Sequence, residues 1–460
     1  MPAPPRTSFR RSAAAIFWLP MFCLLCMVST SAANDLDRLK LADTQIEPVQ
    51  WGDLDGWAAD DHAAALAAFR ASCVAIGRRP ARDERPLRAA LRAACQHARS
   101  VGTPTAEQAR AFFEENFRAV RIAKLGEASG LLTGYYEPIV EGSRFPSPEF
   151  HTPLYRRPRD LLVAGQKPGS GAFPNRANVG RLNANKQFEP YYDRLAIEDG
   201  ALDGQRLEIC WIKDPFDAMS IQIQGSARVI LEDGTTLRIN YDAHNGHSYT
   251  AVGRILIERN LVAREEMSMD RIRRWMQANP DQAKELRGTN RSYVFFRVTG
   301  LSGENEPAGA QGVPLTPGRS IAVDRVHVYG TPFFIEAELP IESARPTTKF
   351  RRLMVAQDTG SAIIGPARAD LYFGAGDDAG RIAGRIRQQG RFVMLIPRAF
   401  DIGTAEPVPL PLPKPAIGVA SAGDKEAAKT KPSLSKPPLK SRQRPEPLSG
   451  PRARRYQHRS

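Results

Sequence analysis

The chain has 460 residues, of which 42% are hydrophobic and 25% are charged, and its formal net charge is +14. This length is sufficient for two or three folded domains. The positive charge lies mainly at the ends, because residues 404–460 hold twelve Lys or Arg against four Asp or Glu, and residues 1–33 hold three Arg. The segment between them is nearly balanced, so the net charge does not indicate a nucleic-acid-binding face.

The N-terminal segment has the pattern of a secretory signal peptide. A basic stretch is followed by an apolar run and then by small residues: Arg6, Arg10 and Arg11, then Ala13–Val28, then Ser31–Ala33. Pro20 interrupts the run, which is shorter than the roughly 20 apolar residues that a membrane-spanning helix needs. We predict that residues 1–33 are a signal peptide cleaved near Ala33, and that the chain is exported to the periplasm. Cys23 and Cys26 do not follow a small residue, so no lipid-modified cysteine is indicated.

Residues 59–122 show apolar residues at three- and four-residue steps, which is typical of helices. Thr105, followed by Glu107 and Gln108, indicates a helix start. Cys73 and Cys95 lie on two of these predicted helices, and in an exported protein a disulfide could join them. Cys210 has the surroundings of a buried strand residue. No Cys/His spacing indicates a metal site, and we predict neither a metal nor a cofactor.

From about residue 130 the pattern changes from helix to strand. Ile221-Gln222-Ile223-Gln224 alternates with period two, which predicts a strand. "EDGTT" at 232–236 predicts a hairpin turn between the strands "ARVIL" and "TLRINY". Residues 248–289 return to a helical pattern, and β character resumes from residue 291 to about 397. We therefore predict an α+β protein that is mainly β, with two barrel-like units, N-terminal helices and further helices in the middle.

The stretch "VAQDTGSAIIGPARADLYFG" at 355–374 holds the Asp-Thr-Gly-Ser signature of aspartic peptidases. Such an enzyme needs two loops of this type facing each other, because two carboxylates share one proton. "DDAGR" at 377–381 and "EDGTT" at 232–236 do not have that form. A retropepsin-like domain could supply the second loop by dimerising, so the peptidase stays an alternative.

Glycoside chemistry needs an acid that protonates the leaving oxygen and a group that quenches an oxocarbenium-like centre. If the 6-hydroxyl of the sugar attacks, one carboxyl group can be the acid first and the base second. Asp324, Asp358 and Asp370 are the candidates, although a single Asp more often caps a turn or pairs with Arg. We expect Asp370 to carry the proton, because Leu371, Tyr372 and Phe373 would desolvate it, and Asp358 to stay ionised in its turn.

The same acids lie in "IAVD…DTGSAI-x₆-D-LYFG", which resembles the three-aspartate (3D) domain. The rest of the segment 120–398 resembles the membrane-bound lytic murein transglycosylase A family. The matching stretches are "LLTGYYEP" (131–138), "IQIQGSARV" (221–229), "YDAHNGHSYTAVGR" (241–254), "NRSYVFF" (290–296) and "GAQGVPLTPGRSIAVD" (309–324). The resemblance implies a double-psi β-barrel with an inserted second β domain. It also implies cleavage of the β-1,4 bond between N-acetylmuramic acid and N-acetylglucosamine in peptidoglycan, which leaves a 1,6-anhydromuramic acid end.

Position by position, the resemblance implies that Asp370 is the catalytic acid/base and that Asp358 is the neighbouring acid. It implies that the substrate-binding residues are Thr133, Tyr135, Tyr136, Gln222, Gln224, Gly225, Asp324 and Tyr372. Tyrosine rings can stack on sugars and glutamine amides can bond sugar hydroxyls, although Tyr135 and Tyr136 could equally be core residues.

The resemblance and the composition together divide the chain into five segments. They are a signal peptide (1–33), an N-terminal helical part (34–137), an inserted β domain with terminal helices (138–289), the 3D barrel domain (290–400) and a disordered Pro/Lys/Arg-rich tail (401–460). The expected partner is the peptidoglycan glycan strand, with no nucleic acid. The tail is either a solvated linker or a peripheral contact to anionic envelope surfaces, which include the outer membrane. A non-catalytic peptidoglycan-binding protein remains a further alternative.

Overall fold

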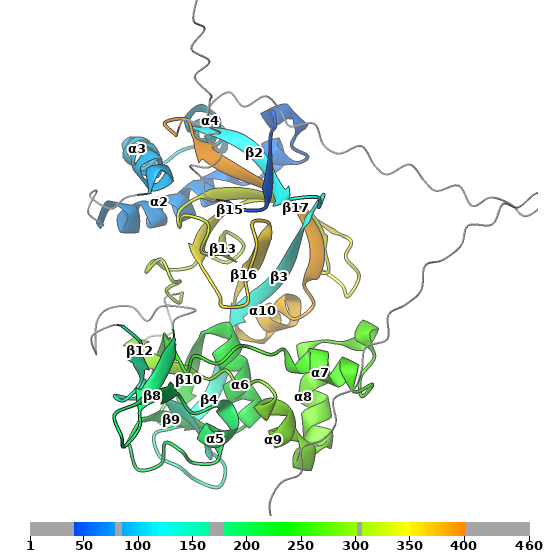
Figure 1. Ribbon diagram of the computed structural model, residues 1–460. Coiled ribbons are helices and arrows are strands. Elements are labelled where there is room, and N and C mark those ends of the chain that lie inside the picture. The colour runs from blue at the N-terminus through cyan, green and yellow to red at the C-terminus, as the bar shows by residue number, and fades with distance from the viewer. Residues whose placement is uncertain (1–40, 79–84, 166–177, 301–305, 401–460) are drawn as a thin grey trace, which may run out of the picture. The chain divides into compact units, whose positions relative to one another are not determined.

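The computed structural model describes residues 41–78, 85–165, 178–300 and 306–400 (Figure 1). The predicted signal peptide and the basic tail lie outside these residues. Within them, no helix is long and apolar enough to cross a membrane.

Six strands close into a barrel, because β17 pairs with both β14 and β3. The ring runs β17-β14-β15-β13-β16-β3. Its strands are β3 (Gly130–Glu137), β13 (Ser320–Val323), β14 (Pro332–Leu339), β15 (Thr348–Asp358), β16 (Arg368–Ala375) and β17 (Arg387–Pro397). Pairs β13–β15 and β16–β3 are parallel, and β1 (Thr44–Pro48) and β2 (Phe117–Lys124) extend the sheet beyond β17. This architecture confirms the prediction of a mainly β, α+β protein with a double-psi β-barrel.

The N-terminal helices pack beside the barrel and share its apolar core. They are η1 (Trp51–Asp53), η2 (Trp57–Ala59), α2 (His62–Arg78), α3 (Pro86–Ser100) and α4 (Ala106–Asn116). Thr105 caps α4 through a capping box with Gln108, as its sequence predicts. The helical pattern extends to residue 122, but α4 ends at Asn116 and the chain continues as β2, where β-branched residues pair with β1 and β17.

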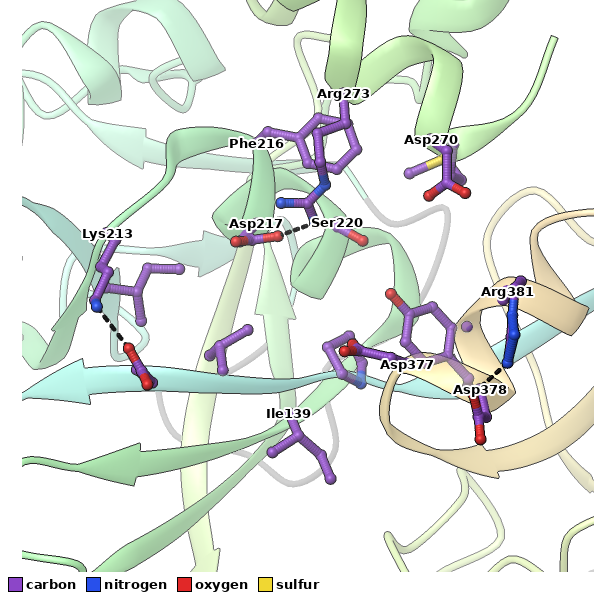
Figure 2. Close-up of a pocket in the computed structure, with 17 residues that line it drawn as sticks. Ile139, Lys213, Phe216, Asp217, Ser220, Asp270, Arg273, Asp377, Asp378 and Arg381 are labelled. Carbon is purple, nitrogen blue, oxygen red and sulfur yellow. Dashed lines mark hydrogen bonds and ion pairs between the residues drawn. The ribbon is translucent and has the colours of Figure 1, made fainter. Parts of the chain in front are cut away.

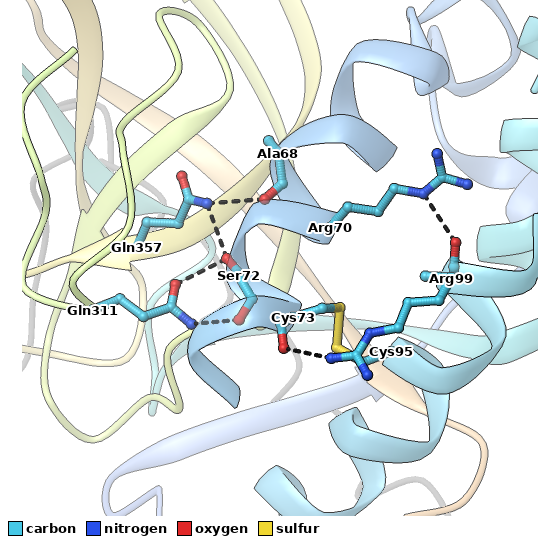
Figure 3. Close-up of a disulfide and its surroundings, with 9 residues drawn as sticks. Ala68, Arg70, Ser72, Cys73, Cys95, Arg99, Gln311 and Gln357 are labelled. Carbon is cyan, nitrogen blue, oxygen red and sulfur yellow. Dashed lines mark hydrogen bonds between the residues drawn. A yellow bond between two sulfur atoms is a disulfide. The ribbon is translucent and has the colours of Figure 1, made fainter. Parts of the chain in front are cut away.

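A disulfide joins Cys73 of α2 to Cys95 of α3 (Figure 3). Directly before Cys73 on α2, the Ser72 hydroxyl accepts a hydrogen bond from Gln357 Nε2 at 2.9 Å and donates one to Gln311 Oε1 at 2.9 Å. Gln357 Nε2 also donates to the carbonyl of Ala68. The disulfide-linked helix therefore contacts the barrel at the residue that immediately precedes Asp358.

The chain between β3 and β13 builds a second β unit. Its sheet has the order β12-β11-β10-β4-β9-β5, and a parallel bridge between Arg156 and Phe296 links the ends of its two edge strands. The strands are β4 (Ile139–Ser143), β5 (Thr152–Tyr155), β9 (Glu208–Ile212), β10 (Ser226–Leu231), β11 (Thr236–His244) and β12 (Val294–Gly300), and a small sheet contains β6 (Leu162–Val163), β7 (Val179–Leu182) and β8 (Phe188–Pro190). Cys210 is buried in β9, as expected.

Helices accompany both units. They are α5 (Arg194–Glu198), α6 (Pro215–Gln224), α7 (Val252–Glu258), η4 (Arg264–Glu266), α8 (Met269–Ala278) and α9 (Pro280–Gly288) in the second unit, and α10 (Gly376–Ala383) after β16. Glu137 at the end of β3 is fully buried, and it forms ion pairs with Arg228 of β10 and Arg238 of β11. These buried pairs tie the last residue of a barrel strand to the second unit.

The predicted strand over residues 221–224 is wrong, because these residues form the last turn of α6. Asp214 caps this helix by accepting the Phe216 N–H, Pro215 occupies its first turn and Gly225 ends it at a φ of 84°. The alternation of Ile and Gln over four residues is too short to decide between strand and helix. The capping signals on either side decide in favour of the helix.

Candidate active site

The two principal acids lie on strands that flank β13. Ala322 is the register partner of Asp370 on β16 and also of Asp358 at the end of β15. Because neighbouring strands are about 4.8 Å apart, this pairing holds the two acids roughly 10 Å apart at their Cα atoms. Their carboxyl groups are close enough for the charge of Asp370 to raise the pKa of Asp358.

Asp370 is held by polar groups from its own strand and from β3. Parallel pairing makes Thr133 its register partner, and the Thr133 hydroxyl donates a hydrogen bond to Asp370 Oδ1. Arg368 Nη1 forms an ion pair with the same oxygen, and Arg368 Nη2 donates to Thr133 Oγ1 at 2.9 Å. The side chain of Asp370 is 21% exposed, so it remains accessible to a ligand.

Asp358 has surroundings different from those that the sequence led us to expect. Its Oδ1 accepts backbone N–H groups of Ala310 at 2.8 Å and Thr359 at 2.9 Å, which favours the ionised form. Burial nevertheless raises the pKa of Asp358 to about 6, and it outweighs these bonds. The expected hydrogen bonds of the turn are therefore present, but they do not hold the pKa of Asp358 at its usual low value. The group is ionised above about pH 6 and protonated below it.

Asp324 accepts hydrogen bonds from the backbone of two neighbouring loops. Its Oδ1 accepts the Val326 N–H at 3.2 Å and its Oδ2 accepts the Gly365 N–H at 2.7 Å. The residue is 7% exposed. Both carboxylate oxygens thus stabilise turns, which is the structural role that a single Asp most often has.

Tyr135 and Tyr372 lie together beside the acids, with ring centroids 5.2 Å apart. Burial, and then the negative charge of Asp358, raise the pKa of Tyr135 well above its usual value. The Tyr372 hydroxyl donates to Glu306 Oε2 at 2.5 Å. Both tyrosines are buried, so most of their area serves packing around the acids.

Tyr136 projects from the opposite face of β3, since successive side chains of a strand alternate. It lines a separate cavity of about 720 Å³ that contains neither Asp358 nor Asp370 (Figure 2). Its other charged and polar lining residues are Glu141, Lys213, Asp217, Ser220, Asp270, Arg273, Asp377, Asp378 and Arg381. Arg273 pairs with Asp217 there, and Arg381 pairs with Asp378. Tyr135 and Tyr136 therefore face different parts of the molecule.

Three further positions expected to bind substrate, two on α6 and Gly225 directly after it, make internal contacts. Gln222 is 6% exposed, and its Oε1 accepts a hydrogen bond from Arg194 Nη2 at 2.6 Å. Gln224 Oε1 accepts the Tyr136 backbone N–H at 3.1 Å and so links α6 to β3. The Gly225 carbonyl accepts the Tyr241 N–H at 2.7 Å. These contacts position the segment next to β3.

Sequence reasoning missed Arg368 and Glu306. A signal for Arg368 was present, because a residue two positions before Asp370 on a strand lies on the same face. No sequence signal indicated Glu306, since its contact with Tyr372 depends on how a loop folds over the barrel. Among the described residues, no group of three or more His, Cys, Asp or Glu could hold a metal ion.

Comparisons with known proteins agree with this architecture. Residues 131–297 match the model of the MltA specific insert domain and residues 319–396 match that of the 3D domain. The chain is 33% identical over 282 residues to the membrane-bound lytic murein transglycosylase A of Vibrio cholerae. This match covers 59% of this chain and 68% of the relative.

Two solved structures resemble the described fold. The crystal structure of a membrane-bound lytic murein transglycosylase from Agrobacterium tumefaciens is 37% identical with a TM-score of 0.68, and the match covers 77% of this chain and 98% of that one. Escherichia coli MltA with bound chitohexaose is 27% identical with a TM-score of 0.54, and the match covers 72% of this chain and 90% of that one.

Proposed function

The chain belongs to the membrane-bound lytic murein transglycosylase A family and carries a 3D domain, and from this premise we propose that it is a peptidoglycan lytic transglycosylase. It cleaves the β-1,4 bond between N-acetylmuramic acid and N-acetylglucosamine without a metal ion. The observation that supports this proposal most is the position of Asp370. Its register partner on β3 is Thr133, and on its other side Ala322 of β13 separates it from Asp358 on β15.

In the proposed first step, Asp370 donates a proton to the glycosidic oxygen and the bond from that oxygen to C1 of the muramic acid breaks. Asp370, now ionised, then takes the proton of the 6-hydroxyl as O6 bonds to C1. The proton that leaves in the first step is replaced in the second, so one carboxyl group is sufficient and no water is consumed. Asp358, ionised above about pH 6, would place a negative charge near the oxocarbenium-like centre.

The aspartic-peptidase alternative has little to support it. In the described residues, the acid that faces Asp358 is Asp370 on a strand, and it is not part of a second Asp-Thr/Ser-Gly loop. The names of the relatives also describe murein transglycosylases and not peptidases. Those names place the relatives at a membrane, and we propose that this chain works in the periplasm, with its basic tail as a contact to anionic envelope surfaces.

The proposal is tested by the mass of the fragments that the purified protein releases from peptidoglycan. Intramolecular attack adds no water, so each fragment should be lighter by one water than the hydrolysis product and should lack a reducing end. Fragments with free reducing ends would indicate a hydrolase, released peptides would indicate a peptidase, and binding without products would indicate a non-catalytic wall-binding protein.

A further inference from the structure

Arg368 lies beside the proposed acid, and the two steps above give it no task. Its Nη1 donates to the Ala369 carbonyl at 2.7 Å and to Asp370 Oδ1, and its Nη2 donates to Thr133 Oγ1. Thr133 and Arg368 both approach the same oxygen of Asp370. These contacts place a cation at Oδ1, whereas Oδ2 of Asp370 has no hydrogen-bond partner among the described residues.

Arg368 also has hydrogen-bonding capacity to spare. A guanidinium carries five N–H donors, and the contacts above use two on Nη1 and one on Nη2. Among the described residues, the Nε–H and the second Nη2–H have no acceptor within hydrogen-bond distance. The side chain is 15% exposed. A planar guanidinium with free donors is well suited to bind a carboxylate or carbonyl group of a ligand.

We infer that Arg368 recognises the lactyl group of the muramic acid whose glycosidic bond is cleaved, and that this contact draws Arg368 away from Asp370. The inference rests on the proposed function. Muramic acid differs from N-acetylglucosamine by this 3-O-lactyl ether, which ends in a carboxylate or, where a peptide is attached, in an amide carbonyl. Both accept hydrogen bonds from a guanidinium.

The lactyl group lies on the same ring as the C1 atom of the broken bond, so one side chain adjacent to the acid can reach it. When Arg368 turns to the lactyl oxygen, Asp370 loses its cationic partner. A nearby cation favours the ionised carboxylate, so its departure favours the protonated form that donates to the glycosidic oxygen. Recognition of muramic acid and release of the acid are then a single event. A glycan without lactyl groups, such as chitohexaose, binds without causing this release.

The test compares Arg368→Gln, Arg368→Lys and the control Arg387→Gln. Arg387 is exposed, lies on β17 as a register partner of Thr133, and forms no ion pair with a described residue. For each variant we would measure kcat/KM on soluble muramic-acid-containing strands and the dissociation constant for chitohexaose by calorimetry. Hydrogen bonds to charged groups are strong enough for Arg368→Gln to lower kcat/KM by about 10- to 100-fold.

The dissociation constant for chitohexaose should stay within about twofold of wild type in Arg368→Gln, because no charged contact is lost there. Arg368→Lys keeps the charge without the planar fork and should restore part of kcat/KM. Arg387→Gln should leave both quantities unchanged. A thermal melt of each variant verifies folding. If Arg368→Gln is unfolded, Arg368→Lys replaces it in the test, since its kcat/KM should still be lower than that of wild type while its dissociation constant for chitohexaose stays unchanged.

Two results would overturn the inference. One is an equal loss on both glycans, which would mean that Arg368 only shapes the site. The other is an unchanged kcat/KM on muramic-acid strands in both variants. A failure of the proposed function is distinguishable from these results, since it would appear in the wild-type protein as products with free reducing ends, whatever the Arg368 variants do.

Discussion

Asp358 and Asp370 are register neighbours of the same alanine, but their surroundings differ. Asp370 contacts a cation and a hydroxyl, whereas Asp358 has two backbone N–H groups, the Tyr135 side chain and the negative charge of Asp370 near it. A buried carboxylate with few charged partners destabilises the fold when it is ionised. Above about pH 6, where Asp358 is ionised, it therefore lowers the stability of the fold. Groups with such shifted pKa values are often found at functional sites.

Asp358→Asn should stabilise the protein at neutral pH. The pKa of Asp358 rises from an unfolded value of about 3.9 to about 6 on folding, so the wild type loses stability as the pH rises through that window. The difference in unfolding free energy, variant minus wild type, should increase by roughly 2–3 kcal/mol from pH 4 to pH 7.5. Denaturant titrations at the two pH values measure it. A difference that does not change with pH would contradict the assigned pKa shift.

Asp358→Asn should lower the rate of cleavage, although it raises the stability of the fold. If the ionised Asp358 stabilises the developing positive charge, the wild-type rate should fall as the pH drops through about 6. Asp358→Asn should have a lower rate at pH 7.5 and should not show this fall. A pH–rate profile of both proteins on the same strands provides the check. An acidic fall of equal size in the variant would mean that another group causes it.

At the scale of elements, α2 and α3 form a unit that supports the strand bearing Asp358. Removing the disulfide by Cys73→Ser with Cys95→Ser should lower the unfolding free energy by about 3 kcal/mol, because a loop of 22 residues regains its freedom in the unfolded chain. Melting with and without a reductant measures this. The wild type should lose stability on reduction and the double variant should not. No response of the wild type would contradict the disulfide.

β3 and α10 approach each other closely at Gly134, where an added Cβ would lie 2.7 Å from the Ala383 Cα. Gly134→Ala should therefore destabilise the fold by about 1–3 kcal/mol and should also lower activity, since β3 carries Thr133 and Tyr135. Gly102→Ala is the matched control, because nothing lies within 4 Å of an added Cβ there. Equal melting temperatures for the two variants would contradict the close packing of β3 on α10.

Sequence reasoning succeeded where a pattern is long or a motif is specific, and it failed where three-dimensional contacts decide. The capping box at Thr105 and the acids of the 3D motif were visible in the chain. The helix over residues 221–224 was not, because four alternating residues fit either element and Gly225 had to be recognised as a cap. The raised pKa of Asp358 was also missed, because burial depends on contacts between segments that are distant in the sequence, such as the one with Ala310, 48 residues away.

At the scale of the whole molecule, the last described residue is Phe400, which is buried against the barrel core. Deleting residues 401–460 should leave the melting temperature and the activity on soluble strands unchanged. Binding to intact sacculi at low salt should weaken, because twelve Lys or Arg of the tail are lost and exposed charges act over roughly 10 Å at 0.1 M salt. Sedimentation with sacculi at two salt concentrations measures this. Unaltered binding would indicate that the tail is only a solvated linker.

The central claim is that Asp370 carries the proton in a cleavage that forms 1,6-anhydromuramic acid ends, and Asp370→Asn tests it most directly. Asparagine keeps the shape of the side chain but cannot release the proton, and general acid–base help is typically worth about 10²–10⁴-fold. The measurement is the yield of anhydro fragments by mass spectrometry, with strand binding measured in parallel. We predict that Asp370→Asn binds strands and forms anhydro ends at least about 10³-fold more slowly than wild type, since one residue serves both steps. Anhydro ends formed by Asp370→Asn at the wild-type rate would contradict the claim.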